Sequence, residues 1–268
     1  MSVPRPAAIV LIGTAAGFFS GLFGVGGGVV MVPLLLLLLG MNERQATSTS
    51  LGAIVIIATA ATLTQGAYGQ VHVAEGVLVG LPAIGGALIG TAIQQRIPAR
   101  RVSLLFAVLL LAVAGLMAAG IEPGDGGGDI DAARVVAALG VGLAAGVISG
   151  LLGVGGGSLF VPGLALLLGL SHVEAEATSL LAMIPVSAVG AWRQHRYGNL
   201  DHRAGLVIGV AAIPFAAIGV VAVNEVPPRI VEIGFALLLV YVAWQMVRGG
   251  ITELREAREA GGGPAGTS

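Results

Sequence analysis

The chain has 268 residues, of which 56% are hydrophobic and 10% charged, and 13 Lys and Arg against 14 Asp and Glu give a formal charge of −1. A soluble domain carries about 25% charged residues, so this composition excludes a surface that water solvates on all sides. The sequence therefore predicts an all-α polytopic membrane protein, and the lack of cysteine excludes disulfides, thiolate zinc sites and iron–sulfur clusters.

The first predicted element, residues 7–40, is a long apolar run that a glycine-rich break interrupts. The stretch at 17–33 reads GFFSGLFGVGGGVVMVP, and 129 residues later 146–162 reads GVISGLLGVGGGSLFVP, with 11 of 17 positions identical. A repeat at a fixed period is stronger evidence about architecture than any local motif. The chain therefore consists of two related halves.

Three apolar runs follow the broken stretch in each half, each about 20 residues long, the length that crosses a bilayer as a helix. They lie near 47–66, 75–95 and 102–120 and, after a second broken stretch at 132–169, near 177–195, 204–224 and 228–247. We accordingly expect a first membrane repeat at 1–120, an external polar linker at 121–131, a second membrane repeat at 132–248 and a cytoplasmic tail at 249–268 with a disordered end.

The distribution of arginine indicates how the chain passes through the membrane, because cytoplasmic loops collect positive charge. If each broken stretch crosses once, the arginines divide 8 to 5 between the two sides; if each is a re-entrant hairpin, they divide 11 to 2. The hairpin is therefore favoured over a kinked single span. It predicts two inverted repeats, each with a re-entrant helix hairpin plus three spanning helices, in the cell membrane with both termini cytoplasmic.

The glycine breaks are the candidate substrate site. Backbone N–H and C=O groups at membrane depth must be satisfied, so an unwound segment is retained mainly where it lines a cavity. Two helices that resume near Val29 and Ser158 would point their positive N-terminal ends into the breaks, and inverted-repeat transporters bind anions between such ends. The candidate glycines are Gly24, Gly26, Gly27, Gly28, Gly153, Gly155, Gly156 and Gly157.

Polar side chains beside the breaks are further candidates for substrate binding. They are Ser20, Thr49, Ser50, Gln65, Ser149, Ser158, Thr178, Ser179 and Gln194. A hydroxyl in a membrane helix usually bonds the carbonyl four residues back, and an amide can cap a helix end, so structural roles stay open for each. Glycines at four-residue spacing, Gly13/Gly17/Gly21 and Gly142/Gly146/Gly150, instead predict close helix crossings.

Charged side chains are expected outside the spans, with no Asp, Glu, Arg, Lys or His deep within one. A carboxylate inside the membrane is the usual mark of proton or sodium coupling, so a built-in proton relay is not expected. An uncharged path suits an anion that leaves the cell, since each exported charge gains about 2.3 kcal/mol per 100 mV. This pattern favours an anion exporter.

The duplicated SGLFGVGGGVVMVP and SGLLGVGGGSLFVP, the ATSTSL and AEATSL that follow them, and the Tyr-Gly pairs at 68–69 and 197–198 resemble the TauE/SafE family of membrane permeases over about residues 7–247. The resemblance implies an inner-membrane transporter of sulfite, sulfonates or related small organosulfur anions, often outward. It also implies that the glycine breaks and the Thr-Ser pairs line the substrate. One departure is Ile56 in the first half where the second half has Pro185.

The predicted function is a membrane transporter, acting as an exporter, of small sulfur-containing anions held near the midplane. The alternatives are a transporter of a carboxylate or a metal ion, an intramembrane enzyme built on Ser149, and a non-transporting assembly or signalling protein. The enzyme needs a base near Ser20 or Ser149, and the non-transporting protein would have its two breaks packed shut. The expected partners are a small anionic substrate and the lipid bilayer, with homo-oligomerisation left open and no nucleic acid, cofactor, metal or catalytic residue.

Overall fold

The computed structural model describes residues 5–97 and 132–227 continuously, and single residues between 107 and 115 and between 229 and 244. The first half contains α1 (Arg5–Phe23), α2 (Gly28–Leu39), α3 (Glu43–Ala67) and α4 (Val73–Arg96), and the second contains α6 (Ala132–Leu152), α7 (Gly157–Leu168), α8 (His172–Arg196) and α9 (His202–Glu225). Outside the described residues lie the predicted linker 121–131, the tail 249–268, most of the predicted span 102–120 and part of the predicted span 228–247.

Six of these helices, α1, α3, α4, α6, α8 and α9, are long and apolar enough to cross a membrane. The prediction of an all-α polytopic membrane protein is thereby confirmed. The other two, α2 and α7, have 12 residues each. At 1.5 Å per residue they are about 18 Å long and cannot cross a hydrocarbon core of about 30 Å alone.

Matching signals begin and end the same helices in the two halves. A capping box of Asn42 and Gln45 begins α3, and one of Ser171 and Glu174 begins α8. Each box satisfies backbone donors that the first helical turn leaves free. The repeat in the sequence is thus also a repeat in local structure.

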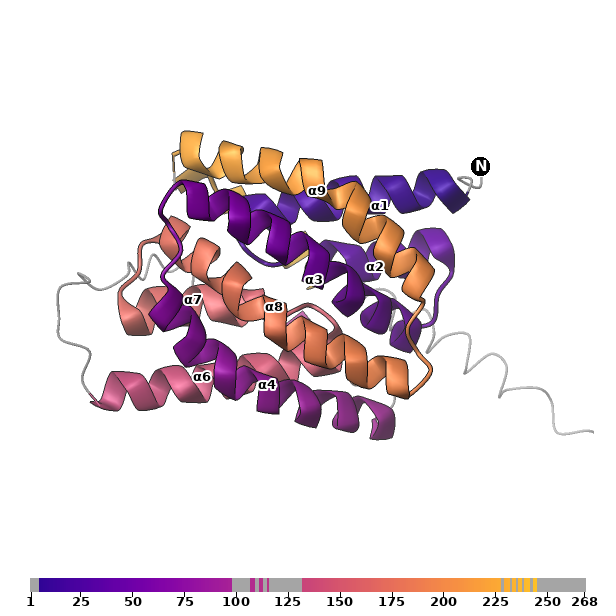
Figure 1. Ribbon diagram of the computed structural model, residues 1–268, viewed down its shortest axis with the longest axis horizontal. Helices are drawn as coiled ribbons and strands as arrows, with labels where there is room; N and C mark the ends of the chain where they lie inside the picture. Colours follow the sequence, from indigo (N-terminus) through magenta and orange to yellow (C-terminus); the bar gives the residue numbers. More distant parts are fainter. Residues whose placement is uncertain are drawn as a thin grey trace, which may run out of the picture.

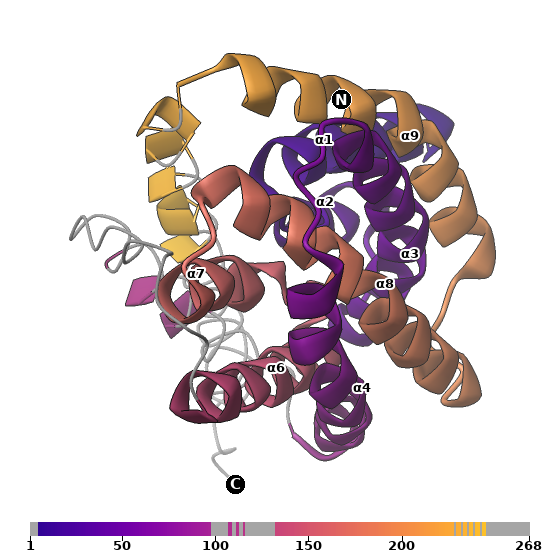
Figure 2. The ribbon, with the colours of Figure 1, turned by 60° about the vertical axis from the view of Figure 1, so that its left-hand side comes forward.

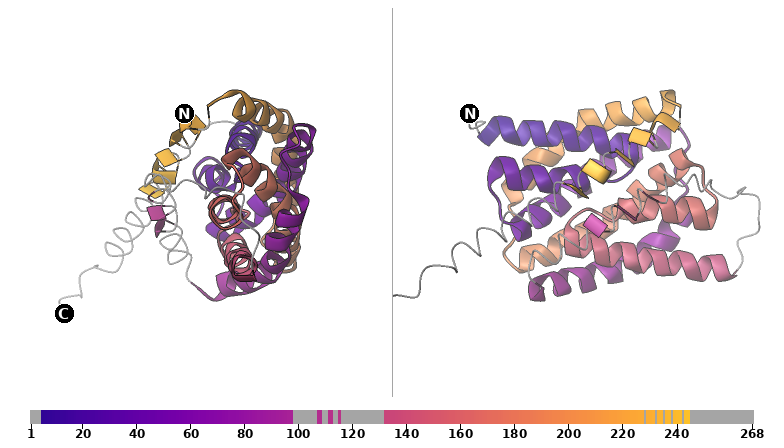
Figure 3. Two further views of the ribbon diagram at one scale, coloured as in Figure 1. Left: turned by 90° about the vertical axis from the view of Figure 1, so that its left-hand side faces the viewer. Right: turned by 180° about the vertical axis from the view of Figure 1, so that it is seen from behind.

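Helices from opposite halves form the two outer pairs of the bundle. Figure 1 shows α1 beside α9 along one edge and α4 beside α6 along the other. Between these pairs α3 and α8 cross (Figure 2), and from behind α2 and α7 also lie between the pairs (Figure 3, right). Each half therefore packs on the other rather than forming a bundle of its own.

Glycines allow these outer pairs to approach closely. A methyl group added at Gly13 would lie 2.8 Å from the carbonyl oxygen of Ile208, and additions at Gly17 and Gly146 would collide with the carbonyls of Ala212 and Ala83. These contacts repeat at the 129-residue offset, since α1 meets α9 as α6 meets α4. The prediction that the four-residue glycine spacings form helix crossings is confirmed.

Each glycine break reverses the chain. Gly27, before α2, approaches Ala16 of α1, while Arg5 at the start of α1 and Leu38 near the end of α2 line one cavity. In the second half, Gly156 approaches Ala145, and later in α7 Gly163 approaches Val141, earlier in α6. Both short helices thus run back along the helices that precede them, as hairpins do.

The two halves run in opposite directions. The connection between α2 and α3 lies at one end of the bundle, and the connection between α7 and α8 lies at the other (Figure 1). Helix ends at the α2–α3 end carry Arg5, Arg44, Arg96, Arg193, Arg196 and Arg203. The sides of the membrane to which these ends belong stay a prediction.

Candidate functional site

The two breaks, residues 24–27 and 153–156, have backbone conformations that favour glycine. Gly24 and Gly153 have φ of 63° and 70°, and the glycine pairs that follow Val25 and Val154 have φ between 71° and 88°. Only glycine adopts this left-handed region without strain. These glycines allow the chain to turn back within four residues.

The helices that follow the breaks begin without side-chain caps. Gly27 and Gly156 are their N-cap residues, and neither has a side chain that could accept a bond from the first turn. The first N–H groups of a helix have no partner within it, and the dipole makes this end positive. The starts of α2 and α7 are therefore the parts of the breaks suited to an anion.

The two breaks touch each other near the middle of the bundle. A methyl group added at Gly28 would lie 2.6 Å from Cα of Val154, and one added at Gly157 would lie 2.6 Å from Cα of Val25. Met183, near the middle of α8, places its terminal methyl against the glycines at 26 and 155. The structure thus brings Gly26, Gly28, Gly155 and Gly157 together and fills the space between them with side chains.

Ile54 of α3 occupies the position equivalent to Met183, and its side chain also contacts both breaks. Both residues are fully buried. Sequence reasoning missed them, because an apolar residue within an apolar span carries no sign of contact with a glycine break.

Two serines hold the breaks in place across the halves. Ser50 Oγ donates a hydrogen bond of 2.7 Å to the carbonyl oxygen of Gly153, and Ser179 Oγ donates one of 2.5 Å to the carbonyl oxygen of Gly24. An unsatisfied buried carbonyl is costly, so each serine stabilises the unwound segment of the other half. Ser50 and Ser179 contact the breaks, and the partner of each is backbone. Their binding of substrate stays a prediction.

The neighbouring threonines bond connections at the two ends of the bundle. Thr178 Oγ1 accepts a hydrogen bond of 3.0 Å from the backbone N–H of His72, and Thr49 Oγ1 accepts one of 3.3 Å from that of Asp201. These N–H groups precede α4 and α9. The structure does not bring the threonine hydroxyls to the breaks.

The two glutamines lie near the C-terminal ends of α3 and α8 and bond other amides. Gln65 Oε1 accepts a hydrogen bond of 3.2 Å from Asn224, and Gln194 donates to Gln94 Oε1. Gln94 in turn donates 2.7 Å to the carbonyl oxygen of Leu151, just before the second break. Gln194 is thus connected to that break through Gln94, a residue that sequence reasoning missed.

Three predicted hydroxyls, those of Ser20, Ser149 and Ser158, are fully buried and have no hydrogen-bond partner in the described part of the chain. Ser20 and Ser149 lie in the last turns of α1 and α6, one turn before the breaks, and Ser158 lies in the first turn of α7. A buried hydroxyl without a partner is costly and calls for an explanation. Among the residues that the structure describes, neither Ser20 nor Ser149 has a base in hydrogen-bonding distance that would activate it as a nucleophile.

One charged side chain, that of Glu176, lies inside a candidate spanning helix, in the second turn of α8. This residue lies in α8 and is fully buried, and its carboxylate lies 3.1 Å from Nε2 of His172, one turn earlier. The predicted span began at 177, where the apolar run begins, whereas α8 begins five residues earlier at its capping box. The Ser171–Glu174 spacing was the signal that could have placed Glu176 inside a helix.

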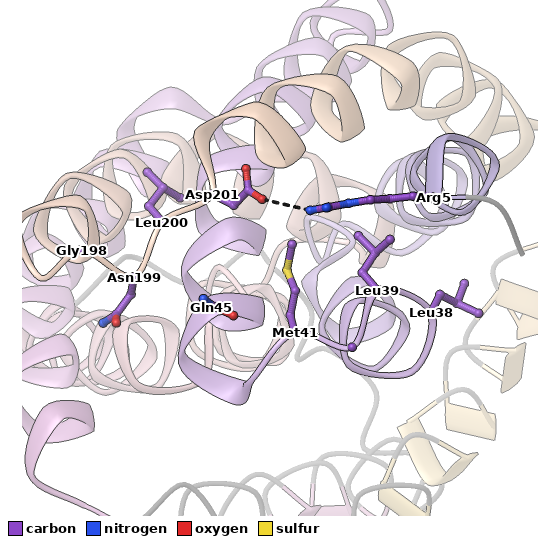
Figure 4. Close-up of a pocket in the computed structure, with 10 residues that line it drawn as sticks. Arg5, Leu38, Leu39, Met41, Gln45, Gly198, Asn199, Leu200 and Asp201 are labelled. Atoms are coloured by element: carbon purple, nitrogen blue, oxygen red, sulfur yellow. Dashed lines mark ion pairs between the residues drawn. The ribbon is translucent and has the colours of Figure 1, made fainter. Parts of the chain in front are cut away.

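A cavity of about 400 Å³ lies at the end of the bundle that carries the six arginines. It is lined by the start of α1, the α2–α3 connection and the α8–α9 connection, and Arg5 pairs with Asp201 at 3.8 Å beside it (Figure 4). Met41 and Leu39 also face it. The length of α2 separates it from the first break by about 18 Å.

Together these features define a polytopic helical membrane protein with two glycine-broken hairpins that meet at its centre. The family model described as sulfite exporter TauE/SafE matches residues 1–117 and 138–267. The chain therefore belongs to the TauE/SafE sulfite exporter family, as the sequence resemblance predicted.

Curated relatives carry the same general description. A probable membrane transporter protein of Xylella fastidiosa is 28% identical over 88% of this chain and 95% of its own length. The probable membrane transporter protein YunE of Bacillus subtilis is 24% identical over 91% of this chain and 97% of its own length, and one of Haemophilus influenzae is 28% identical over 88% and 96%. No solved structure matches the chain. The chain is thus a probable membrane transporter of this family.

Proposed function

We propose that this protein exports small sulfur-containing anions, such as sulfite or organosulfonates, and binds them where its two glycine breaks meet. The observation that carries the proposal is the meeting of two uncapped helix N-termini, at Gly28 and Gly157, beside buried hydroxyls that have no partner. Backbone N–H groups at the starts of α2 and α7, with buried serine hydroxyls within about one turn of each break, suit an oxyanion, which accepts several hydrogen bonds at once.

The chemistry of the site favours an anion over the alternative cargoes. A metal ion would call for carboxylate, imidazole or thiolate ligands, whereas these breaks offer mainly backbone donors and serines. The named family supports a sulfur oxyanion, and the outward direction is supported by the interior-negative membrane potential, which favours anion exit.

Transport requires the breaks to separate from the arrangement described. Met183 and Ile54 fill the space between them, and closed breaks were the feature expected of a non-transporting protein. In a transporter the same packing is one state of an alternating cycle, the closed state between openings to either side. The family and its transporter relatives support this second interpretation.

The orientation belongs to the same proposal. We infer that the end carrying Arg5, Arg44 and Arg96 faces the cytoplasm, so that both termini are cytoplasmic and the cavity beside Arg5 is an entrance for anions from inside the cell. Arginines around an entrance raise the local concentration of anions.

Flux of radiolabelled sulfite through proteoliposomes tests the proposal. Ser20→Ala, Ser149→Ala and Ser158→Ala should each lower the rate several-fold while the protein stays folded. Thr59→Ala is the matched control, because Thr59 Oγ1 bonds the carbonyl of Val55 in its own helix at 2.6 Å. A toluenesulfonate and a dicarboxylate are tested as further substrates in the same assay. A rate for sulfite no higher than that of empty liposomes would contradict the substrate, and serine variants at the wild-type rate would contradict the site.

A further inference from the structure

A chain of amide side chains connects the cavity beside Arg5 with the second glycine break. Asn199 lines that cavity, and its Nδ2 donates a hydrogen bond of 3.0 Å to Gln194 Oε1. Gln194 donates to Gln94 Oε1, and Gln94 donates 2.7 Å to the carbonyl oxygen of Leu151, just before the break. The exposed fractions of Gln194 and Gln94 are 0% and 3%. Polar side chains therefore continue from the cavity into the interior of the bundle.

One buried face of α8 extends from this amide chain to the place where the breaks meet. Residues three or four apart are neighbours on one side of a helix. In α8 this spacing joins Met183, Ser187, Gly190 and Gln194, all of them buried. Met183 contacts both breaks, and Gln194 lies about 16 Å further along the helix axis at about 1.5 Å per residue. The face thus leads from the amide chain to the breaks.

Ser187 on this face has a buried hydroxyl that bonds nothing. The residue is fully buried, and its Oγ has no hydrogen-bond partner within the described ranges. Hydroxyls in membrane helices commonly bond the carbonyl four residues back, as Thr59 and Thr64 do in α3. A buried hydroxyl that leaves even this bond unmade calls for an explanation. An oxyanion that reaches this face in an open state of the transporter would accept the missing bond.

The space between Ser187 and Gln194 is occupied by a side chain of the other half. A methyl group added at Gly190 would lie 3.0 Å from Cδ1 of Leu51, which is fully buried in α3. Long side chains of a helix point toward its N-terminus, which for Gln194 is the direction of Gly190 and Ser187. Once Leu51 withdraws, an anion beside Gly190 would lie between an amide and a hydroxyl.

The first half does not repeat these polar groups. At the offset of 129, Ala58 corresponds to Ser187 and Val223 corresponds to Gln94. The glycine crossings do repeat at that offset, so the packing of the helices does not require the serine or the glutamine. Both polar residues lie on the side of the breaks that faces the cavity. Their position therefore fits a role in the path of the substrate better than a role in the fold.

We propose that Gln194 and Ser187 form an inner binding site for an oxyanion, which the anion occupies between the cavity and the glycine breaks. This inference rests on the proposed transport function. Asn199 bonds Oε1 of Gln194, so the N–H donors of that amide are directed into the bundle, where Gln94 accepts from them in the closed packing. In the open state the anion takes the place of Gln94 as acceptor and also receives the hydroxyl of Ser187. Neutral donors bind it weakly enough to release it to the breaks.

A thiol at position 187 tests the site without reference to transport. Ser187→Cys introduces one thiol into a chain that has no cysteine. Thr91→Cys is the matched control, because Thr91 is equally buried and bonds the carbonyl of Ala87 in its own helix at 2.9 Å. In the purified full-length protein, sulfonatoethyl methanethiosulfonate should modify the Ser187→Cys variant several-fold faster than the control. It should also react several-fold faster there than the cationic trimethylammonium analogue does.

Two results would overturn the inner site in this experiment. Equal modification of the two variants, including none in either, would mean that the face of α8 is no more accessible than any packed helix. Equal rates for the anionic and the cationic reagent would mean that the face does not select anions.

Flux measurements link the site to transport. In proteoliposomes, Ser187→Ala and Gln194→Met should each raise several-fold the sulfite concentration that gives half-maximal flux, because each removes a donor. Thr91→Val should leave that concentration unchanged. Ser187→Ala should unfold at a temperature no lower than the wild type, since its hydroxyl has no bond to lose within the described ranges. This separates a binding role from a structural one.

The outcome of the flux measurements distinguishes the two proposals. An unchanged half-maximal concentration in Ser187→Ala would contradict binding at this serine. Absence of any sulfite flux in the wild type would instead contradict the proposed substrate, and the thiol modification would still decide whether the inner site exists.

Discussion

Ser179 of the second half donates a hydrogen bond of 2.5 Å to the carbonyl oxygen of Gly24 in the first half, and Ser50 and Gly153 form the reciprocal bond of 2.7 Å. These bonds satisfy carbonyl groups that the breaks would otherwise bury without partners. Each unwound segment therefore depends on a hydroxyl that belongs to the other repeat. The positions of the two serines differ by 129, as do those of the two glycines.

Removal of either hydroxyl should destabilise the fold. Ser50→Ala and Ser179→Ala should each lower the free energy of unfolding by about 1–3 kcal/mol, because a buried carbonyl is left unsatisfied. Thermal unfolding in detergent measures the change. Thr64→Ala, which removes a bond of 2.9 Å within one helix, should cost less. Equal losses in all three variants would contradict the bracing role.

The close helix crossings predict that alanine destabilises the protein at some glycine positions and not at others. Gly17→Ala and Gly146→Ala should prevent normal packing, because the added methyl group collides with the backbone of the facing helix. We expect a cost of about 1–3 kcal/mol or more. Gly140→Ala, with no atom within 4 Å of the added carbon, should be neutral or slightly stabilising because alanine favours the helix. Size-exclusion chromatography after heating would report the folded fraction, and a Gly17→Ala variant as stable as Gly140→Ala would contradict the crossing.

Met183 and Ile54 should control which anions pass. Met183→Ala would remove the methyl that fills the space between the breaks, at a cost in stability of about 2–5 kcal/mol. Toluenesulfonate flux should rise relative to sulfite flux, because the larger anion needs the vacated space. Ile57→Ala, one turn from Ile54 and equally buried, should lower stability without changing that ratio. A ratio that both variants change alike would mean that the size of the anion is sensed elsewhere.

The opposite directions of the halves predict opposite accessibility of two tyrosines. Tyr68 and Tyr197 are the C-cap residues of α3 and α8 and are both exposed. The C-terminal ends of these two helices lie at opposite ends of the bundle (Figure 1). Because the chain has no cysteine, Tyr68→Cys and Tyr197→Cys each introduce one thiol. A membrane-impermeant maleimide should label the first in intact cells and the second only in inverted vesicles. Labelling of both from one side would contradict the inverted arrangement.

The repeat offset, visible in the sequence, predicted more of the fold than composition did. The spanning helices α3, α4, α8 and α9 lie within a few residues of the predicted runs, because apolar length decides which segments can cross a membrane. Their starts were less accurate, since capping boxes extend α3 and α8 before the apolar residues begin. That difference placed Glu176 outside the span and hid the buried pair.

The candidate site was only partly predictable. Glycines with positive φ follow from the motif itself, and their positions in the breaks agree with it. The partner of a hydroxyl depends on tertiary packing, so Ser179 and Thr178, adjacent in the sequence, bond to a break and to a connection respectively. The contacts of Met183 depend on how the two halves pack together. The sequence of either half alone does not indicate that packing.

The reciprocal packing of α1 on α9 has a consequence for biosynthesis. The ribosome completes α9 about 200 residues after α1, which at about 5–20 residues per second takes about 10–40 s. During that interval the glycine face of the first hairpin has no permanent partner in the nascent chain. Lipid or an assembly factor must cover it until the second half arrives, and a protein truncated after α4 should be degraded rather than accumulate as a stable half.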